Sequence, residues 1–200
     1  MRLRITVCLF VLTLLSVALP SAVAAQERKG FWFGAGGGLG TAGISCDGCE
    51  GGRESSGVGY LRLGWTASDR LLIGGEINLW NKQYALEEGI IGTANLYNFS
   101  GTLTFYPSAS AGFFVKGGAG SSTVDLDLDA EGTNITVEVG TGLGFLVGTG
   151  YDFRVGQRIS ITPGVNFWYG NLGDVTLRGQ PFLNNFKHNV VDFTIGITFH

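Results

Sequence analysis

The sequence predicts an all-β fold: an eight-stranded antiparallel up-and-down transmembrane β-barrel that follows a cleaved signal peptide. Three observations support this prediction. The N-terminus reads as an export signal, the rest of the chain is poor in charge and rich in glycine, and eight segments alternate apolar residues with polar or small ones. A chain of this kind presents an outer surface that suits lipid better than water.

The N-terminus has the order of a secretory signal peptide. Arg2 and Arg4 precede an apolar run, and the small residues from Ala22 to Ala25 offer a cleavage site before polarity resumes. The apolar run is shorter than the ~20 residues that a membrane-spanning helix needs. We therefore expect residues 1–25 to be removed during export and residues 26–200 to form one barrel domain.

The composition of the chain argues against several functional classes. Charged residues make up 14% of the sequence, and 34 of its 200 residues are glycine. A typical soluble domain has about 25% charged residues, so this chain lacks the charge to coat a soluble globule. Without Arg2 and Arg4 it keeps 11 basic and 16 acidic residues, a formal net charge of −5. Nucleic acid is therefore not an expected partner, because phosphate binding needs a basic surface.

Alternation of apolar and polar residues predicts the strands. Transmembrane β-strands show this pattern because one face meets lipid and the other faces the lumen. It is clearest at the C-terminus, where every second residue from Val191 to Phe199 is apolar. An even number of strands also brings both ends of the barrel domain to the periplasmic side. The predicted strands cover residues 31–39, 61–66, 71–79, 97–105, 113–120, 137–153, 159–169 and 191–199.

The predicted connections alternate in length. Short periplasmic turns and long external loops are typical of outer-membrane barrels. A soluble barrel of lipocalin type has no reason for this asymmetry and would need a charged exterior, which this sequence does not supply. Three connections are short, at residues 68–70, 108–111 and 156–158, and four are long, at roughly residues 41–56, 83–93, 121–135 and 171–189.

Two stretches near the C-terminus, Gly148–Arg154 and Ile159–Val165, together resemble the penultimate hairpin of the small outer-membrane β-barrel family. This family includes the transmembrane domain of outer-membrane protein A and related short virulence-associated barrels. The resemblance covers the whole mature chain in pattern, but only this hairpin and the last strand in residues. It implies that the protein is exported through the periplasm to the bacterial outer membrane.

The resemblance also implies an assembly signal in the last strand. In the family this strand alternates hydrophobic residues and ends on an aromatic residue that the barrel assembly machinery reads. Here Phe199 is the penultimate residue and His200 is the last. The residues expected to form the signal are Val191, Phe193, Ile195, Ile197 and Phe199.

Four charged residues have the parity of the inward face: Arg62, Glu76, Lys116 and Glu138. The interior of an eight-stranded barrel is just wide enough for side chains to fill it. Because an unpaired buried charge is costly, we expect these four to form a lumen charge network. The alternative is that one or two of them lie at the rim in water. Proteins that resemble outer-membrane protein A hold a similar Arg/Lys/Glu network, which implies a plugged lumen by analogy.

Two further predictions concern the cysteines and the membrane interfaces. Cys46 and Cys49 remain after the signal peptide is removed, and such a pair in an exported protein predicts a disulfide, here in the first external loop. A zinc site would need two more ligands, which the flanking sequence does not offer. Tyr97, Tyr151 and Tyr169 are candidates for the aromatic girdles at the membrane interfaces.

The candidate chemical groups do not assemble into a catalytic motif. His188 and His200 are the mature histidines, and the His-x-Ser-Asn arrangement of lipid A deacylases is absent. A hydroxyl nucleophile needs an adjacent, oriented base, which the sequence does not indicate. Asp125, Asp127 and Asp129 alternate along one segment; they suit either a divalent cation or, more simply, a solvated strand extension. We expect no enzyme activity, no cofactor and no bound metal.

The sequence therefore predicts a non-enzymatic structural or surface-interaction barrel of the outer membrane that displays four external loops. Expected partners are outer-membrane lipid and lipopolysaccharide, the barrel assembly machinery, and an external ligand of unknown identity; we expect a monomer. The first alternative is a narrow channel for small solutes, although water-filled porins use ~16–18 strands. The second is an enzyme that modifies lipid A.

Overall fold

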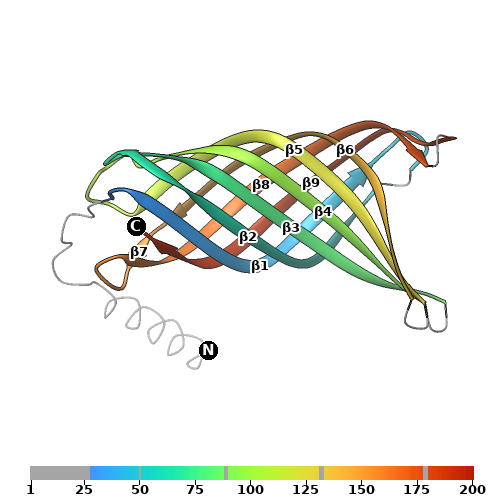
Figure 1. Cartoon of the computed structure of the whole chain (residues 1–200), viewed down its shortest axis with the longest axis horizontal. Coiled ribbons are helices and arrows are strands. Elements are labelled where there is room, and N and C mark those ends of the chain that lie inside the picture. The colour runs from blue at the N-terminus through green and yellow to red at the C-terminus, as the bar shows by residue number, and fades with distance from the viewer. Residues whose placement is uncertain (1–27, 50, 88–89, 131–132, 178–179) are drawn as a thin grey trace, which may run out of the picture.

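The computed structural model describes residues 28–49, 51–87, 90–130, 133–177 and 180–200, and they form a β-barrel (Figure 1). The predicted signal peptide, residues 1–25, lies outside the described residues and stays a prediction. None of the described residues forms a helix that could cross a membrane. The strands are β1 (Phe31–Ser45), β2 (Gly52–Ser68), β3 (Leu71–Glu87), β4 (Ile90–Phe105), β5 (Phe113–Ala130), β6 (Thr133–Tyr151), β7 (Phe153–Arg154), β8 (Ile159–Leu177) and β9 (Gln180–Phe199).

Antiparallel pairing closes these strands into a barrel. Each long strand pairs with its neighbours in the chain, β1 pairs with β9, and β6 pairs with β8. The two-residue strand β7 continues β6 beyond Asp152 and also pairs with β8. Counting β6 and β7 as one strand, the barrel has eight strands, and the predicted fold class is confirmed.

The strands are strongly tilted. Paired residues can be followed from strand to strand around the closed barrel. A path that starts at residue 34 of β1 comes back to β1 at residue 44, so the strands are staggered by ten residues in total. With a rise of about 3.3 Å per residue and a strand spacing of about 4.8 Å, this stagger corresponds to a tilt of about 40°. The paired residues are Gly34, Arg62, Glu76, Ser100, Gly120, Gly144, Gly170, His188 and Ile44, in order around the barrel.

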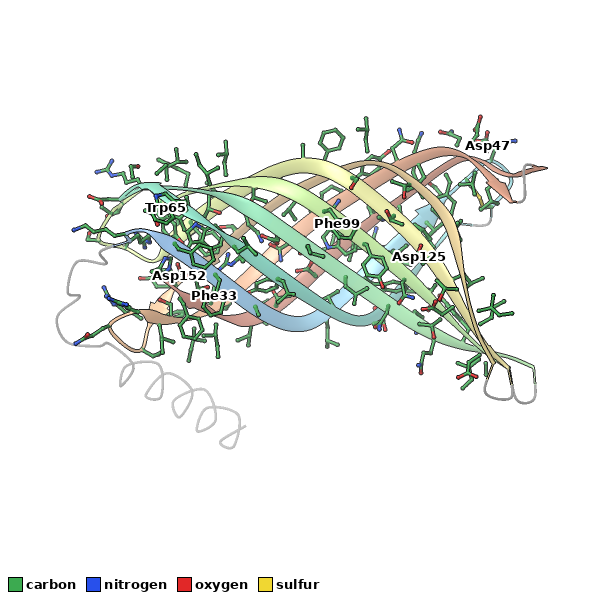
Figure 2. The ribbon with its side chains drawn as sticks, viewed as in Figure 1. Phe33, Asp47, Trp65, Phe99, Asp125 and Asp152 are labelled. Atoms are coloured by element: carbon green, nitrogen blue, oxygen red, sulfur yellow. A yellow bond between two sulfur atoms is a disulfide. The ribbon has the colours of Figure 1, made fainter. Side chains whose placement is uncertain are left out.

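Large apolar side chains cover the outside of the barrel (Figure 2). Leu39 is 74% exposed, Leu143 66% and Trp65 62%, and every long strand contributes such residues. A water-soluble protein rarely leaves so much contiguous apolar surface exposed. On a closed barrel this surface is the belt that meets membrane hydrocarbon, whereas the polar residues that alternate with it point inward.

The four long connections predicted as loops are largely strand, which corrects the sequence-based boundaries. β3 and β4, for example, remain paired from Leu71 and Phe105 as far as Glu87 and Ile90. These extensions lie beyond the apolar belt, where both faces of a strand can meet water. Since neither face must then be apolar, the alternation that identified the membrane-spanning segments is less regular in the extensions.

Two gaps in the pairing divide the extensions into two lobes. Pairing between β2 and β3 ends at Gly57 and Asn81, and pairing between β6 and β8 ends at Leu143 and Asn171. Beyond these two seams, β3, β4, β5 and β6 remain paired with one another and form the β3–β6 lobe. β8, β9, β1 and β2 form the β8–β2 lobe, and Figure 1 shows the ends of the two lobes diverging.

Candidate functional site

A buried ion pair lies in the middle of the lumen. Nζ of Lys116 donates hydrogen bonds to both carboxylate oxygens of Glu76, at 2.5 and 2.7 Å. Their side chains are 4% and 1% exposed, so water does not screen the charges. Lys116 lies on β5 and Glu76 on β3, and the pair thus ties together strands that are not neighbours.

Arg62 lies close to this pair but makes different contacts. Its guanidinium carbon lies 5.5 Å from the ring centres of Tyr60 and Phe114 and 5.9 Å from that of Trp32. Nη2 of Arg62 donates a hydrogen bond to Oγ1 of Thr198 at 2.6 Å. Aromatic faces attract a desolvated cation, and these rings thus stabilise a charge that is almost fully buried.

Arg62, Glu76, Lys116 and Asp192 form one group of buried charges across the lumen, which we call the charged layer. Asp192 supplies its second negative charge. Its carboxylate accepts hydrogen bonds from Nδ2 of Asn166 at 2.6 Å and from Nε1 of Trp168 at 3.0 Å. Asp192 is 4% exposed. Among the described side chains, the layer thus balances two cations, Arg62 and Lys116, with two carboxylates, Glu76 and Asp192.

An apolar plug fills the lumen on the external side of the charged layer and continues into the base of the β8–β2 lobe. Trp80 and Trp168 are 1% and 0% exposed. Nε1 of Trp80 donates to the carbonyl of Gly40 at 3.2 Å, which satisfies the indole where water is excluded. We call this group the upper plug; its buried members are Ala42, Trp80, Leu96, Val124, Leu146, Trp168, Leu172, Val175, Phe186 and Val190.

A second plug closes the end of the barrel that carries the short turns. This lower plug consists of Trp32, Leu72, Tyr106 and Phe114. Arg28 covers it: its guanidinium carbon lies 3.5 Å from the ring centre of Tyr106. Burial lowers the pKa of Arg28 and raises that of Tyr106, because water is excluded from both groups.

Arg28 and Asp152 hold the lower plug in place. Arg28 donates to the carbonyls of Ala109 and Ala111 in the turn between β4 and β5, at 3.2 and 2.7 Å. Asp152 accepts hydrogen bonds from the Tyr106 hydroxyl at 2.7 Å and from Oγ1 of Thr162 at 2.6 Å. Asp152 lies at the turn end in Figure 2.

His188 lies within the upper plug and does not form a catalytic triad. Oγ of Ser122 donates to the carbonyl of Tyr97 at 2.8 Å and lies 2.7 Å from Nε2 of His188. With the hydroxyl proton directed at Tyr97, Nε2 of His188 acts as the donor to Ser122. Nδ1 of His188 is buried and has no hydrogen-bond partner among the described residues, so none of them orients the ring as a base.

The external lobes hold the predicted cysteines and the aspartate series. Cys46 and Cys49 lie at disulfide distance, with 5.2 Å between their Cα atoms. Asp127 on β5 accepts hydrogen bonds from Nδ2 of Asn95 at 2.7 Å and from Oγ1 of Thr136 at 2.5 Å. These donors occupy its carboxylate as part of a strand extension. The described residues contain no cluster of three or more ligands suited to a metal ion.

The structure brings together part of the predicted charge network. Arg62, Glu76 and Lys116 share one layer of the lumen. The side chain of Glu138 lies outside the described residues; its backbone pairs with Asp125 beyond an irregularity in the ladder that skips Val139. Such a bulge reverses the parity on which the inward prediction for Glu138 depended.

The remaining predicted residues lie on the outward face. Tyr151 is at the turn end with its ring 4.6 Å from that of Phe153, and the ring of Tyr97 is 6.2 Å from that of Phe99. Tyr169 on β8 pairs with Phe145 and Asn189. The residues of the expected assembly signal, Val191, Phe193, Ile195, Ile197 and Phe199, have outward parity on β9, and Phe199 stacks on Phe33 with ring centres 4.5 Å apart.

Three buried polar residues escaped the sequence-based site prediction. Asp192 has inward parity, so the signal that selected Arg62 could also have selected it, whereas Ser122 lies in a segment that was predicted to be a loop. Arg28 precedes the first strand, and strand periodicity gives no information on it. The contacts of Arg28 depend on the turn between β4 and β5, about 80 residues away in the sequence.

Comparison with known proteins rests on structure alone. No protein-family model matches the chain, and no curated protein matches its sequence. Solved outer-membrane barrels match well. Ail, the attachment invasion locus protein of Yersinia pestis, superimposes with a TM-score of 0.61 at 12% identity, over 86% of this chain and 100% of Ail. Neisserial surface protein A gives a TM-score of 0.56 at 17% identity, over 86% and 98%. The chain thus has the fold of the small bacterial outer-membrane β-barrels, and its apolar belt places it in such a membrane.

Proposed function

We propose that the protein is a non-enzymatic surface barrel whose sealed lumen anchors two external lobes that contact partners outside the cell. The observation that carries this proposal is the filling of the lumen. The upper and lower plugs lie on either side of the charged layer, and the ion pair of Lys116 and Glu76 is formed within that layer. Described side chains that pack the lumen in this way hold the strands in place and disfavour a water-filled path.

Conductance in planar bilayers tests the sealed lumen. We expect the wild-type protein to pass no steady current. The double variant Trp80→Ala/Trp168→Ala removes the two largest side chains of the upper plug and should raise the frequency of current steps. Trp65→Ala is the matched control, because Trp65 faces lipid and its loss leaves the lumen filled. Steady conductance by the wild type would contradict the surface-barrel proposal and support the alternative, a narrow channel for small solutes.

An enzyme acting on lipid A receives less support. Acyl transfer by a serine needs a base that accepts the hydroxyl proton and a further group that orients this base. The only histidine next to a serine in the described part of the chain is His188, and Ser122 directs its proton to a carbonyl instead. Both side chains are also almost fully buried, away from the membrane surface where lipid A lies.

The charge of the lobes favours a cationic partner. The described part of the two lobes carries more carboxylates than cations: Asp47, Glu54, Asp125, Asp127, Asp129 and Asp174, against Arg53, Lys82 and Lys187. Ail was solved with the heparin analogue sucrose octasulfate, a polyanion. We expect this protein to pass through immobilised heparin at physiological salt and to bind immobilised polylysine, with binding weakened by added salt. Retention on heparin would contradict this choice of partner.

A further inference from the structure

A hollow at the turn end of the barrel lies outside the sites described above. It has a volume of about 590 Å³ and is open to the exterior. The start of β1, the turn between β7 and β8, and the end of β9 surround it, at the end where Figure 1 marks the C-terminus. Its lining residues are Lys29, Phe31, Arg154, Gln157, Arg158 and His200.

The lining of this hollow is cationic. Lys29, Arg154 and Arg158 carry positive charge at neutral pH. Arg154 donates hydrogen bonds to the carbonyls of Gly156 and Gln157, which hold its side chain along the turn. The carboxylate of Asp152 lies 3.4 Å from Nε2 of His200. It is buried, and Tyr106 and Thr162 already donate to it.

Cations gather at this end although the chain as a whole has a formal net charge of −3. The external lobes have the opposite balance, with carboxylates in excess. A surface with an excess of cations attracts anionic partners. The described charged residues of the turn end are Arg28, Lys29, Arg70, Arg154 and Arg158, against Asp69 and Asp152.

The hollow lies at the edge of the apolar belt. Phe31 both lines it and is 56% exposed on the outer surface. Phe153 and Val155, the neighbours in sequence of the lining residue Arg154, are 53% and 60% exposed. Where an apolar belt ends, lipid headgroups begin, and short turns mark this end as the periplasmic one. The cationic side chains are therefore at the depth of the phosphates in the periplasmic leaflet.

We propose that this hollow binds the phosphate of an anionic phospholipid from the periplasmic leaflet. Lys29 and Arg158 supply charge, and an arginine can hold two phosphate oxygens at once. The acyl chains of the same lipid would extend along Phe31 and Phe153, on the outer surface. The occupant is thus a lipid rather than a soluble anion, because the site joins cationic and apolar surfaces. The external lobes play no part in this binding, so it does not depend on the proposed surface function.

Lipid retention tests the proposal. The protein is folded into nanodiscs of phosphatidylcholine that contain one fifth phosphatidylglycerol, released gently, and weighed by native mass spectrometry. We expect phosphatidylglycerol to remain bound to the wild type in excess over phosphatidylcholine. Each basic residue near anionic lipid contributes about a fivefold change in binding, so Lys29→Gln/Arg158→Gln should lower retention at least tenfold.

Controls make each outcome decisive. Arg70→Gln removes a cation from the same end that does not line the hollow, and it should keep wild-type retention. Folding of every variant is checked by the change in gel migration on boiling; if the double variant fails this check, Arg158→Gln alone replaces it. In the wild type, retention should fall as salt rises. Equal retention of the two lipids, an equal loss in Arg70→Gln, or full displacement by millimolar inorganic phosphate would overturn the proposal.

Discussion

Arg62 and Glu76 face each other across the ladder between β2 and β3, yet Glu76 forms its ion pair with Lys116, two strands away. Arg62 instead lies among three aromatic rings and donates to Thr198. In a narrow barrel, inward side chains from distant strands approach as closely as those of neighbours. The pairing of charges therefore follows the geometry of the lumen rather than the register of the sheet.

Removing one member of the central pair should destabilise the barrel strongly. Glu76→Gln and Lys116→Met each leave one buried charge without its partner, which costs about 3–5 kcal/mol. The double variant removes both charges, and we expect it to be more stable than either single variant. Urea titration of the protein in lipid vesicles, followed by tryptophan fluorescence, measures these differences.

The chain offers its own control for this experiment. Lys82 and Glu54 form a second ion pair at 3.3 Å, across the seam between β2 and β3, with side chains that are 30% and 53% exposed. An exposed pair of this kind is worth about 0–1 kcal/mol, so Glu54→Gln should change stability little. Equal losses of unfolding free energy for Glu76→Gln and Glu54→Gln would show that water in the lumen screens the charges of Glu76 and Lys116.

Gly170 is expected to resist substitution. A Cβ atom at this position would approach Nε2 of His188 and Oγ of Ser122 to well under 3 Å. Gly170→Ala therefore forces both side chains apart inside the upper plug, and overpacking of this kind costs about 1–3 kcal/mol. Gly101→Ala is the matched control, because a Cβ there would come no closer than 3.8 Å to its nearest neighbour. If the two variants unfold at the same urea concentration, the tight contact at Gly170 is ruled out.

Arg28 is expected to stabilise the turn end through its forked side chain. Arg28→Lys keeps the charge but cannot donate to the carbonyls of both Ala109 and Ala111 in the same geometry. We expect a loss of about 1–2 kcal/mol and faster hydrogen exchange in the turn between β4 and β5. Arg70→Lys, an exposed position at the same end, should leave exchange unchanged. Unaltered exchange in Arg28→Lys would show that water replaces its contacts.

Cys46 and Cys49 are predicted to form a disulfide in the exported protein, since the periplasm is oxidising. The folded, unreduced protein should therefore show no titratable thiol. The ring that the bond closes is very small, and on the loop-entropy argument it restricts the unfolded chain little. Cys46→Ser/Cys49→Ser should accordingly shift the urea midpoint only slightly. Two reactive thiols in the native protein would contradict the bond.

The membrane-spanning part of the fold could be predicted because lipid imposes a strict period on the sequence. Val191 and Phe193 had to alternate with Asp192 and Thr194, since one face meets hydrocarbon and the other the lumen. Outside the membrane this constraint is relaxed, and strand extensions were mistaken for loops. The prediction for Glu138 depended on unbroken parity, which the irregularity at Val139 removes.

The partners of the buried charges could not be predicted in the same way. Parity shows that a side chain points inward, but the choice between Arg62 and Lys116 for Glu76 depends on distances across the lumen. These distances depend on the stagger of the strands, and the stagger cannot be predicted from the alternation of residues in the sequence. The capping contacts of Arg28 raise a similar difficulty, because they join a segment before the first strand to a remote turn.

The two seams make the external end modular. Beyond the last pairs, Gly57 with Asn81 and Leu143 with Asn171, the described strands of each lobe form ladder pairs only with strands of the same lobe, and the side chain of Lys82 bonds across the seam between β2 and β3. Residues can therefore be added in matched numbers to both strands of an external hairpin without altering the stagger that closes the barrel. The two lobes can therefore diverge separately during evolution, while the part within the membrane stays the same.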